Sequence, residues 1–264
     1  MTAQPIPSPH GFGSLPYLDG PAVSTPWFDL GSGQAINAIR LRGIATFSGD
    51  SGTGKTTTAV VAAERSPLRF VYTKLKNKAG TKDVAEALYR ALHPHHDLKA
   101  ATRERKMVND CTATLMAGNT GVIADEVHRI GVPGMLLLSE IWDSVQQSTG
   151  VGFPLFLVGV DVNAAIASAP ELSTRICARA NFHPLAEQPL LDTLKSMNSR
   201  CAATPDARLL QFDRVWSKGN LRQWRKLMTF LTLNPQPDDA EISVAEIKGF
   251  LVNQGQTLKN VRLT

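Results

Sequence analysis

The chain has 264 residues, of which 43% are hydrophobic and 19% are charged, a balance typical of a soluble globular protein rather than a disordered one. Lysine and arginine exceed aspartate and glutamate by 28 − 23 = 5, so the charge permits an anionic partner such as nucleic acid without requiring one. No run approaches about 18 apolar residues, and the N-terminal MTAQPIPSPH lacks the regions of a signal peptide, so we expect a cytoplasmic protein with no membrane partner.

Proline dominates the first part of the chain. Pro5, Pro7, Pro9, Pro16, Pro21 and Pro26 exclude regular helix up to about residue 30 and predict an extended arm. Because the arm also holds Phe12, Leu15, Tyr17, Trp27 and Phe28, we expect it to dock on this subunit or on a neighbouring one. A short helix over about 32–41 follows, so residues 1–40 form a Pro-rich N-terminal arm with a short helix.

A phosphate-binding pattern comes next, between a predicted strand over 43–48 and a predicted helix over 57–65. The pattern G-x-x-x-x-G-K-[ST] is matched by Gly49, Asp50, Ser51, Gly52, Thr53, Gly54, Lys55 and Thr56. Backbone N–H groups of such a loop, and of the helix that starts near Thr57, surround phosphate groups. Lys55 is expected to reach the β- and γ-phosphates and Thr56 to hold Mg²⁺. The loop therefore predicts that the chain binds a nucleoside triphosphate with Mg²⁺.

Strands and helices alternate up to residue 186. Apolar strands are predicted over 69–75, 121–125 and 153–160, and helices over 81–92, 102–117 and 133–147. This alternation is typical of an α/β fold with a parallel sheet, here over residues 41–186. From residue 187 to 264 the pattern is helical and predicts a small all-helical lid domain. An amphipathic segment over 242–253 could pack on that lid or dock a partner.

An acidic pair, Asp125-Glu126, ends the predicted strand over 121–125. In P-loop ATPases an aspartate at this position supports Mg²⁺, and a following glutamate orients and polarises the attacking water. We therefore expect Asp125 to join Thr56 at the metal and Glu126 to be catalytic. The alternative is a buried strand that ends in two acids without catalytic consequence.

Three later segments carry polar residues at positions where nucleotide contacts occur. Asp161 and Asn163 follow the strand over 153–160, and either could sense the γ-phosphate, although helix capping by Asp161 fits equally well. Arg175 and Arg179 precede a fifth strand expected over 181–185. In the helical part, Gly219-Asn220-Leu221-Arg222 begins a helix.

These motifs, in this order over about residues 40–231, resemble the AAA+ ATPases, and within that superfamily the DNA-transposition ATPases of the MuB, TnsC and TniB group. The resemblance implies that Arg175 or Arg179 reaches the γ-phosphate of a neighbouring subunit and that Arg222 contacts the nucleotide from the lid. It also implies ATP-dependent self-assembly as a ring or helical filament on double-stranded DNA, recruitment of a transposase, and hydrolysis that disassembles the complex.

The resemblance also indicates where DNA would bind. We expect the ATPase module itself to hold DNA, because 40 Pro-rich residues leave no room for the helix-turn-helix domain of phage MuB. The family's DNA-facing loops correspond here to segments that hold Lys74, Lys76, Lys78, Arg103, Arg105 and Lys106. Such cations contact phosphates without reading sequence, although a solvated charged face is the plain alternative.

Other functions share parts of this pattern. Helicase loaders and origin-recognition ATPases share several of the motifs. A P-loop small-molecule kinase would share the phosphate loop but would not need Glu126 or the Gly-Asn-Leu-Arg segment. A nucleotide-gated interaction protein that hydrolyses little ATP is a third alternative.

Neither the cysteines nor the histidines follow a metal-binding spacing. The thiols are expected to be reduced and mostly buried, at Cys111, Cys177 and Cys201. A histidine cluster comprises His93, His95 and His96, but without acidic or cysteine partners it is more typical of a surface turn.

Overall fold

A computed structural model describes residues 22–96, 98, 102–233 and 235–257. The chain divides into two compact units. The first contains Trp27–Asp50 and Lys55–Phe182, and the second contains Val23–Pro26, Ser51–Gly54 and the chain from His183 onward. The expected docking of the arm through Phe12, Leu15 and Tyr17 lies outside the described residues.

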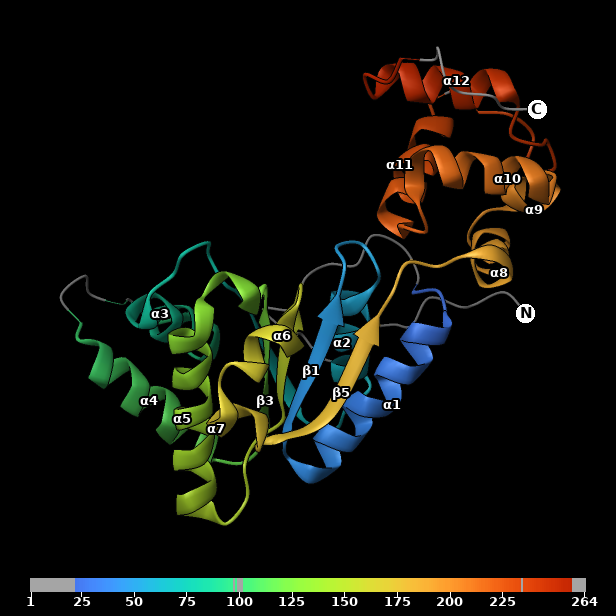
Figure 1. Ribbon diagram of the computed structural model, residues 1–264. Helices are drawn as coiled ribbons and strands as arrows, with labels where there is room; N and C mark the ends of the chain where they lie inside the picture. The colour runs from blue at the N-terminus through green and yellow to red at the C-terminus, as the bar shows by residue number, and fades with distance from the viewer. Residues whose placement is uncertain (1–21, 97, 99–101, 234, 258–264) are drawn as a thin grey trace. The chain divides into compact units, whose positions relative to one another are not determined.

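Strands and helices alternate along the first unit (Figure 1). Their order is α1 (Pro26–Leu41), β1 (Ile44–Gly49), α2 (Lys55–Glu64), β2 (Arg69–Lys74), α3 (Thr81–Leu92), α4 (Glu104–Met116), β3 (Thr120–Asp125), η1 (Val127–Arg129), α5 (Gly131–Thr149), β4 (Leu155–Gly159), α6 (Val162–Ala167), α7 (Pro170–Ser173) and β5 (Ile176–Phe182). The strands form one parallel sheet in the order β2-β3-β4-β1-β5. This arrangement confirms the predicted α/β fold with a parallel sheet flanked by helices.

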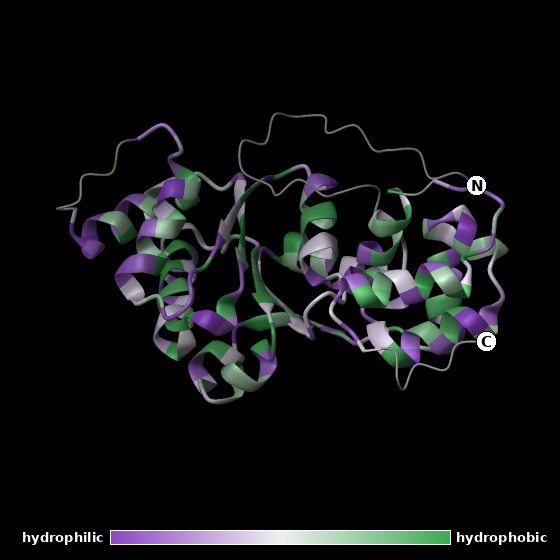
Figure 2. Cartoon of the chain, turned by 90° about the horizontal axis from the view of Figure 1, so that it is seen from above, coloured by the Kyte–Doolittle hydropathy of each residue, from purple (hydrophilic) through white to green (hydrophobic). Residues whose placement is uncertain are grey.

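The sheet is buried on both faces, as parallel sheets require. Along β1, Ala45 and Phe47 pack with residues of α1 and α2, whereas Ile44 packs on the opposite side with residues of α3 to α7. Figure 2 shows green, hydrophobic stretches along the strands together with white and purple ones. Polar side chains therefore gather where the parallel strands end, which is the edge at which α/β proteins bind ligands.

Two predicted boundaries in this unit were wrong. Helix α1 begins at Pro26 rather than near residue 32, because proline fits the first helical turn, where its missing N–H group is not needed. Strand β5 spans Ile176–Phe182 rather than 181–185. Its alternating buried and exposed residues suit an edge strand, whereas Pro184 has no N–H group to donate to a sheet.

The second unit carries the helical C-terminal region. Its helical segments are α8 (Glu187–Met197), α9 (Ser199–Ala203), α10 (Asp206–Phe212), η2 (Asp213–Ser217), α11 (Leu221–Leu231) and α12 (Val244–Asn253). Aromatic rings of Phe212, Trp224 and Phe250 meet edge to face in its core, with centroids 4.7 and 6.0 Å from that of Phe212. The apolar residues Ile247, Phe250 and Leu251 of α12 are buried, so packing inside this unit occupies that face of the helix.

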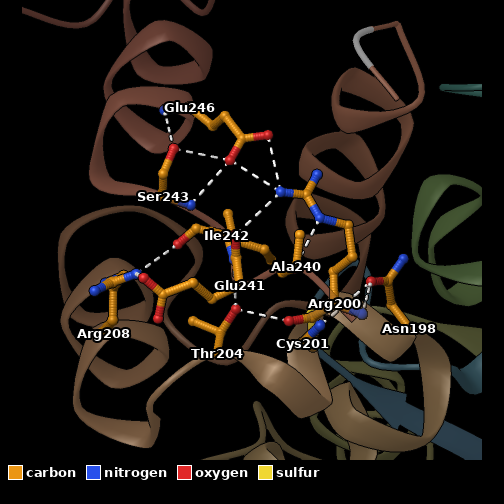
Figure 3. Close-up of polar contacts among 10 residues, drawn as sticks. All are labelled: Asn198, Arg200, Cys201, Thr204, Arg208, Ala240, Glu241, Ile242, Ser243 and Glu246. Carbon is orange, nitrogen blue, oxygen red and sulfur yellow. Dashed lines mark hydrogen bonds and ion pairs between the residues drawn. The ribbon is translucent and has the colours of Figure 1, made fainter. Parts of the chain in front are cut away.

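A buried arginine ties α9 to the start of α12 (Figure 3). The Arg200 guanidinium donates to the carbonyl oxygens of Ala240 and Glu241 over 3.1 and 3.2 Å. It also donates to both carboxylate oxygens of Glu246, over 2.9 Å in each case. Glu246 in turn caps α12 by accepting from the backbone N–H and hydroxyl of Ser243. The loop before α12 is thereby fixed to α9.

Two further expectations concern exposure. Within the described ranges, no helix has both the length and the apolar character needed to cross a membrane. The cysteines are free of disulfides, and Cys111 and Cys201 are buried as predicted, but Cys177 is exposed because it lies on the outer side of the edge strand β5.

Candidate nucleotide-binding site

The predicted phosphate loop connects the end of β1 to the start of α2. Gly54, directly before the helix, has a φ of 99°, a conformation that a residue with a side chain rarely adopts. Lys55 is buried, and its ammonium group donates to the Asp50 carbonyl oxygen over 2.6 Å. Thr57 lies half-buried in the first turn of α2, which contains no acidic residue. The N-terminus of α2 is thus suited to an anionic phosphate.

Asp125 lies at the end of β3, beside the first turn of α2. Its Oδ2 accepts a hydrogen bond from the Thr56 hydroxyl over 3.0 Å, so the two predicted metal ligands come together. Hydroxyl and carboxylate oxygens are ligands that Mg²⁺ prefers. The backbone N–H of Glu126 donates to the other oxygen, Oδ1, over 2.8 Å. The residues present therefore fit a Mg²⁺ ion bound with a triphosphate.

Tyr72 is a residue that the sequence analysis missed. Its hydroxyl donates to Asp125 Oδ2 over 2.8 Å. Burial, together with the Asp125 charge, raises the pKa of the Tyr72 phenol, so the group stays protonated and remains a donor. The alternation along β2 places Tyr72 on a definite face, but only the pairing of β2 with β3 shows that Asp125 shares it.

The Glu126 carboxylate is held by two nearby side chains. Its Oε2 lies 3.1 Å from Arg129 Nε and 3.4 Å from His128 Nε2. His128 Nδ1 accepts the backbone N–H of Val160 over 3.2 Å, which links this carboxylate to the end of β4. Glu126 itself has a φ of 63°, a left-handed conformation that costs energy and recurs at functional sites.

Of the predicted DNA-contacting lysines, Lys74 ends β2, and Lys76 and Lys78 lie in the loop after it, which is anchored to the turn around Glu126. The Lys78 N–H donates to the Arg129 carbonyl oxygen over 3.0 Å, and the Leu75 N–H donates to the Asp125 carbonyl oxygen over 3.0 Å. The cations of both predicted DNA segments are exposed: Lys74, Lys76, Lys78, Arg103, Arg105 and Lys106. They are accessible to a polyanion, and the first segment is joined through the backbone to the residues around Glu126.

The two candidate γ-phosphate sensors differ in their surroundings. The Asn163 Oδ1 accepts from the Thr46 hydroxyl over 2.9 Å and from Arg179 over 3.1 Å, while its Nδ2 donates to Asn181 over 2.7 Å. The exposed Asp161 precedes α6 in a left-handed conformation, and its side chain makes no helix-capping hydrogen bond. Asp161 thus occupies the N-cap position of α6 without a side-chain cap, and the sensor role of either residue stays a prediction.

Arg175 and Arg179, the two arginines expected to reach the γ-phosphate of a neighbouring subunit, both contact residues of their own chain. Arg175 Nε lies 2.6 and 2.8 Å from the carboxylate oxygens of Asp143 on α5, and its guanidinium also donates to the Glu171 carbonyl oxygen. Arg179 extends from β5 and donates to Ser173 over 3.2 Å as well as to Asn163. A role for either arginine in a neighbouring subunit stays a prediction.

The second unit contains the residues expected to act from the lid. Asn220 caps α11 by accepting the Arg222 N–H over 3.0 Å, and its amide donates to the Ser51 carbonyl oxygen over 2.7 Å. The Arg222 guanidinium donates to the Ser51 hydroxyl over 2.9 Å. Within this unit, the Gly-Asn-Leu-Arg segment thus contacts residue 51 of the phosphate loop.

The histidine cluster packs as part of a helix end. The His93 ring lies 4.5 Å from that of Tyr89, and its Nε2 lies 3.2 Å from the Thr114 hydroxyl. Across the part of the chain that the structure describes, no three His, Cys, Asp or Glu side chains gather as a metal site.

Comparison with known proteins agrees with the fold. Residues 39–164 match the model of a family described as AAA domain. One similar solved structure is Cdc6p from Pyrobaculum aerophilum, with a TM-score of 0.68 and 15% identity over 87% of this chain and 68% of that chain. Another is the Aeropyrum pernix ORC1 protein in complex with DNA, with a TM-score of 0.65 and 16% identity over 89% of this chain and 66% of that chain. A third is the RuvB Holliday junction branch migration motor of Thermotoga maritima, with a TM-score of 0.51 and 16% identity over 88% of this chain and 70% of that chain.

The chain spans about two thirds of the length of these structures. No significant match was found among curated protein sequences. At identities of 15–16% the likeness shows the fold alone, and that fold is the AAA+ P-loop fold with a helical C-terminal region.

Proposed function

We propose that the protein is a Mg²⁺-dependent ATPase that assembles on duplex DNA with ATP bound and leaves it after hydrolysis. One observation carries the proposal: the Thr56 hydroxyl donates to Asp125 Oδ2 over 3.0 Å at the start of α2. Lys55 directly precedes Thr56 in the chain, and Glu126 directly follows Asp125. Mg²⁺ held there would neutralise charge on the phosphates. A cradle for phosphate, a metal position and a potential base then occur in one place.

The proposed hydrolysis assigns a task to each of these side chains. Lys55 and the N–H groups of α2 bind and orient the triphosphate. Glu126 orients a water molecule whose oxygen bonds to the γ-phosphorus while the bond to the ADP oxygen breaks, and the water proton passes to Glu126 or to the released phosphate. Arg129 and His128 hold the Glu126 carboxylate, and in this proposal it turns from them toward the water.

Two substitutions separate ATP binding from hydrolysis. Lys55→Ala removes the cradle's cation and is expected to abolish ATP binding and assembly. Glu126→Gln spares the cradle and is expected to bind ATP yet leave persistent rings or filaments on DNA. Phosphate release with and without duplex DNA, together with negative-stain imaging, provides the measurement. A Glu126→Gln protein that disassembles at the wild-type rate would contradict the role of Glu126.

Exposed lysines at the end of β2 and in the loop after it support DNA binding by this module. Each lost phosphate contact lowers the slope of log affinity against log salt by about 0.9 on B-DNA, so three contacts correspond to about 2.7. The triple alanine variant of Lys74, Lys76 and Lys78 should show this change in a salt titration. The matched control removes three exposed cations of the second unit, Arg214, Lys218 and Lys226. An unchanged slope in the first variant would exclude this loop.

For the finer role we propose a target selector in DNA transposition that recruits or activates a transposase. This proposal is supported by the motif resemblance, above all the phosphate loop, Asp125-Glu126 and the Gly-Asn-Leu-Arg segment. The fold similarity to Cdc6p and to ORC1 in complex with DNA favours a second candidate, an origin-recognition-like ATPase.

The two candidates differ in how they depend on DNA sequence. A target selector should bind unrelated duplexes with equal affinity and retain a transposase on them in the presence of ATP. Strong preference for one duplex sequence in a competition assay would favour the origin-recognition reading. Phosphate transfer to a small acceptor without DNA would instead indicate a kinase.

A further inference from the structure

We propose that Tyr72 is a positioning residue for the metal, holding the Asp125 carboxylate in the orientation in which it supports Mg²⁺ beside Thr56. This inference rests on the proposed nucleotide site and adds to it a residue from a neighbouring strand. Tyr72 need not touch the metal or the nucleotide, since it acts through Asp125.

The sheet places Tyr72 next to the acid. Strand β2 pairs in parallel with β3, with Tyr72 opposite Ile123, two residues before Asp125. Because side chains alternate along strands, Tyr72, Ile123 and Asp125 share the face that also receives α2. The Tyr72 ring therefore projects toward the end of β3, where its hydroxyl reaches Oδ2 over 2.8 Å.

Three donors determine the orientation of the Asp125 carboxylate, which is only 5% exposed. The Glu126 N–H binds Oδ1, while the hydroxyls of Thr56 and Tyr72 bind Oδ2. Thr56 would turn its oxygen toward a bound Mg²⁺, so its hydrogen bond to Asp125 changes when the metal enters. In this proposal Tyr72 keeps its hydrogen bond to Oδ2 when the metal binds and so restrains the carboxylate.

Partners of this kind have measurable effects. A group that hydrogen-bonds a metal ligand is typically worth 10- to 100-fold in metal affinity or activity. Tyr72 is suited to this role because its hydroxyl donates to Asp125 Oδ2 over 2.8 Å from the neighbouring strand β2. Phenylalanine keeps the ring of residue 72 and removes only the donor.

The test measures metal affinity directly rather than turnover. Tyr72→Phe should weaken Mn²⁺ binding to the protein–ADP complex by about tenfold, measured by electron paramagnetic resonance, and should leave metal-free ADP binding unchanged. Tyr89→Phe is the matched control, since Tyr89 is a buried tyrosine on α3 whose ring lies against His93. Thermal unfolding of both variants checks that each is folded.

The outcomes separate this inference from the proposed function. A wild-type protein that binds ADP with Mn²⁺ and a Tyr72→Phe variant of equal Mn²⁺ affinity would overturn the role of Tyr72 alone. Equal loss of metal-free ADP binding in Tyr72→Phe would also overturn it, because the hydroxyl would then support the cradle in general. A wild-type protein that binds no nucleotide would overturn the proposed function itself, and this inference with it.

Discussion

Removing the Arg200 side chain tests how the helical unit is held together. Arg200 is 6% exposed and lies on α9, and its guanidinium joins the Ala240 and Glu241 carbonyl oxygens to the Glu246 carboxylate at the start of α12. The Arg200→Ala variant leaves that carboxylate and both carbonyl groups without this donor. It therefore perturbs the packing of α12 without touching the proposed nucleotide site.

The expected loss of unfolding free energy follows from the burial of the Arg200–Glu246 ion pair. Removing one partner of a buried ion pair costs about 3–5 kcal/mol, because a charge stays behind without compensation. The Glu246 side chain retains 22% exposure and keeps its two hydrogen bonds from Ser243. The cost should thus fall near the lower limit, at about 3 kcal/mol. That is a large part of the roughly 5–15 kcal/mol by which a domain is stable.

Urea unfolding followed by tryptophan fluorescence measures this loss, since Trp216 and Trp224 lie in the same unit. The matched control is Lys195→Ala, which breaks a 2.7 Å ion pair with Asp206 whose side chains are 34% and 49% exposed. Such exposed pairs are worth about 0.2–1 kcal/mol. The reasoning is refuted if Arg200→Ala lowers the free energy of unfolding no more than the control does.

Three further predictions concern Glu246, the trans arginine and the Glu126 contacts. Burial alone would raise the pKa of Glu246, but the Ser243 hydrogen bonds and the Arg200 charge together lower it. The stabilisation that the Glu246 carboxylate contributes is therefore fully present above the unfolded pKa of about 4.3 and is lost as the pH falls through the lower folded pKa. In Glu246→Gln, the free energy of unfolding should consequently depend less on pH in this acidic range. Mixing Arg175→Ala with Lys55→Ala protein should restore some ATP hydrolysis if Arg175 acts in a neighbouring subunit, and no restoration would contradict that role. Arg129→Ala should speed hydrolysis by up to about fivefold at unchanged ATP affinity, because releasing Glu126 from one exposed ion pair lowers the barrier by at most about 1 kcal/mol. Slower hydrolysis would instead show that Arg129 orients Glu126 productively.

Local patterns were enough to predict strands β1 to β4, helices α2 to α5 and the phosphate loop. The Gly-rich segment before Lys55 and Thr56 lies between a strand and a helix in both the prediction and the structure. Helix α3 was predicted at its observed bounds, because its apolar period is regular over residues 81–92. The edge strand β5 was misplaced, since its exposed Cys177, Arg179 and Asn181 interrupt the apolar run that marks a buried strand.

The sequence by itself determined the phosphate loop, the acidic pair after β3 and the alternation that makes a parallel sheet, because each depends on neighbours along the chain. Only the tertiary structure decided that Tyr72 meets Asp125, that His128 meets Val160 and that Lys78 meets Arg129. These contacts join segments 32 to 53 positions apart. They depend on the strand order β2-β3-β4-β1-β5, which crossover packing sets and no local pattern encodes.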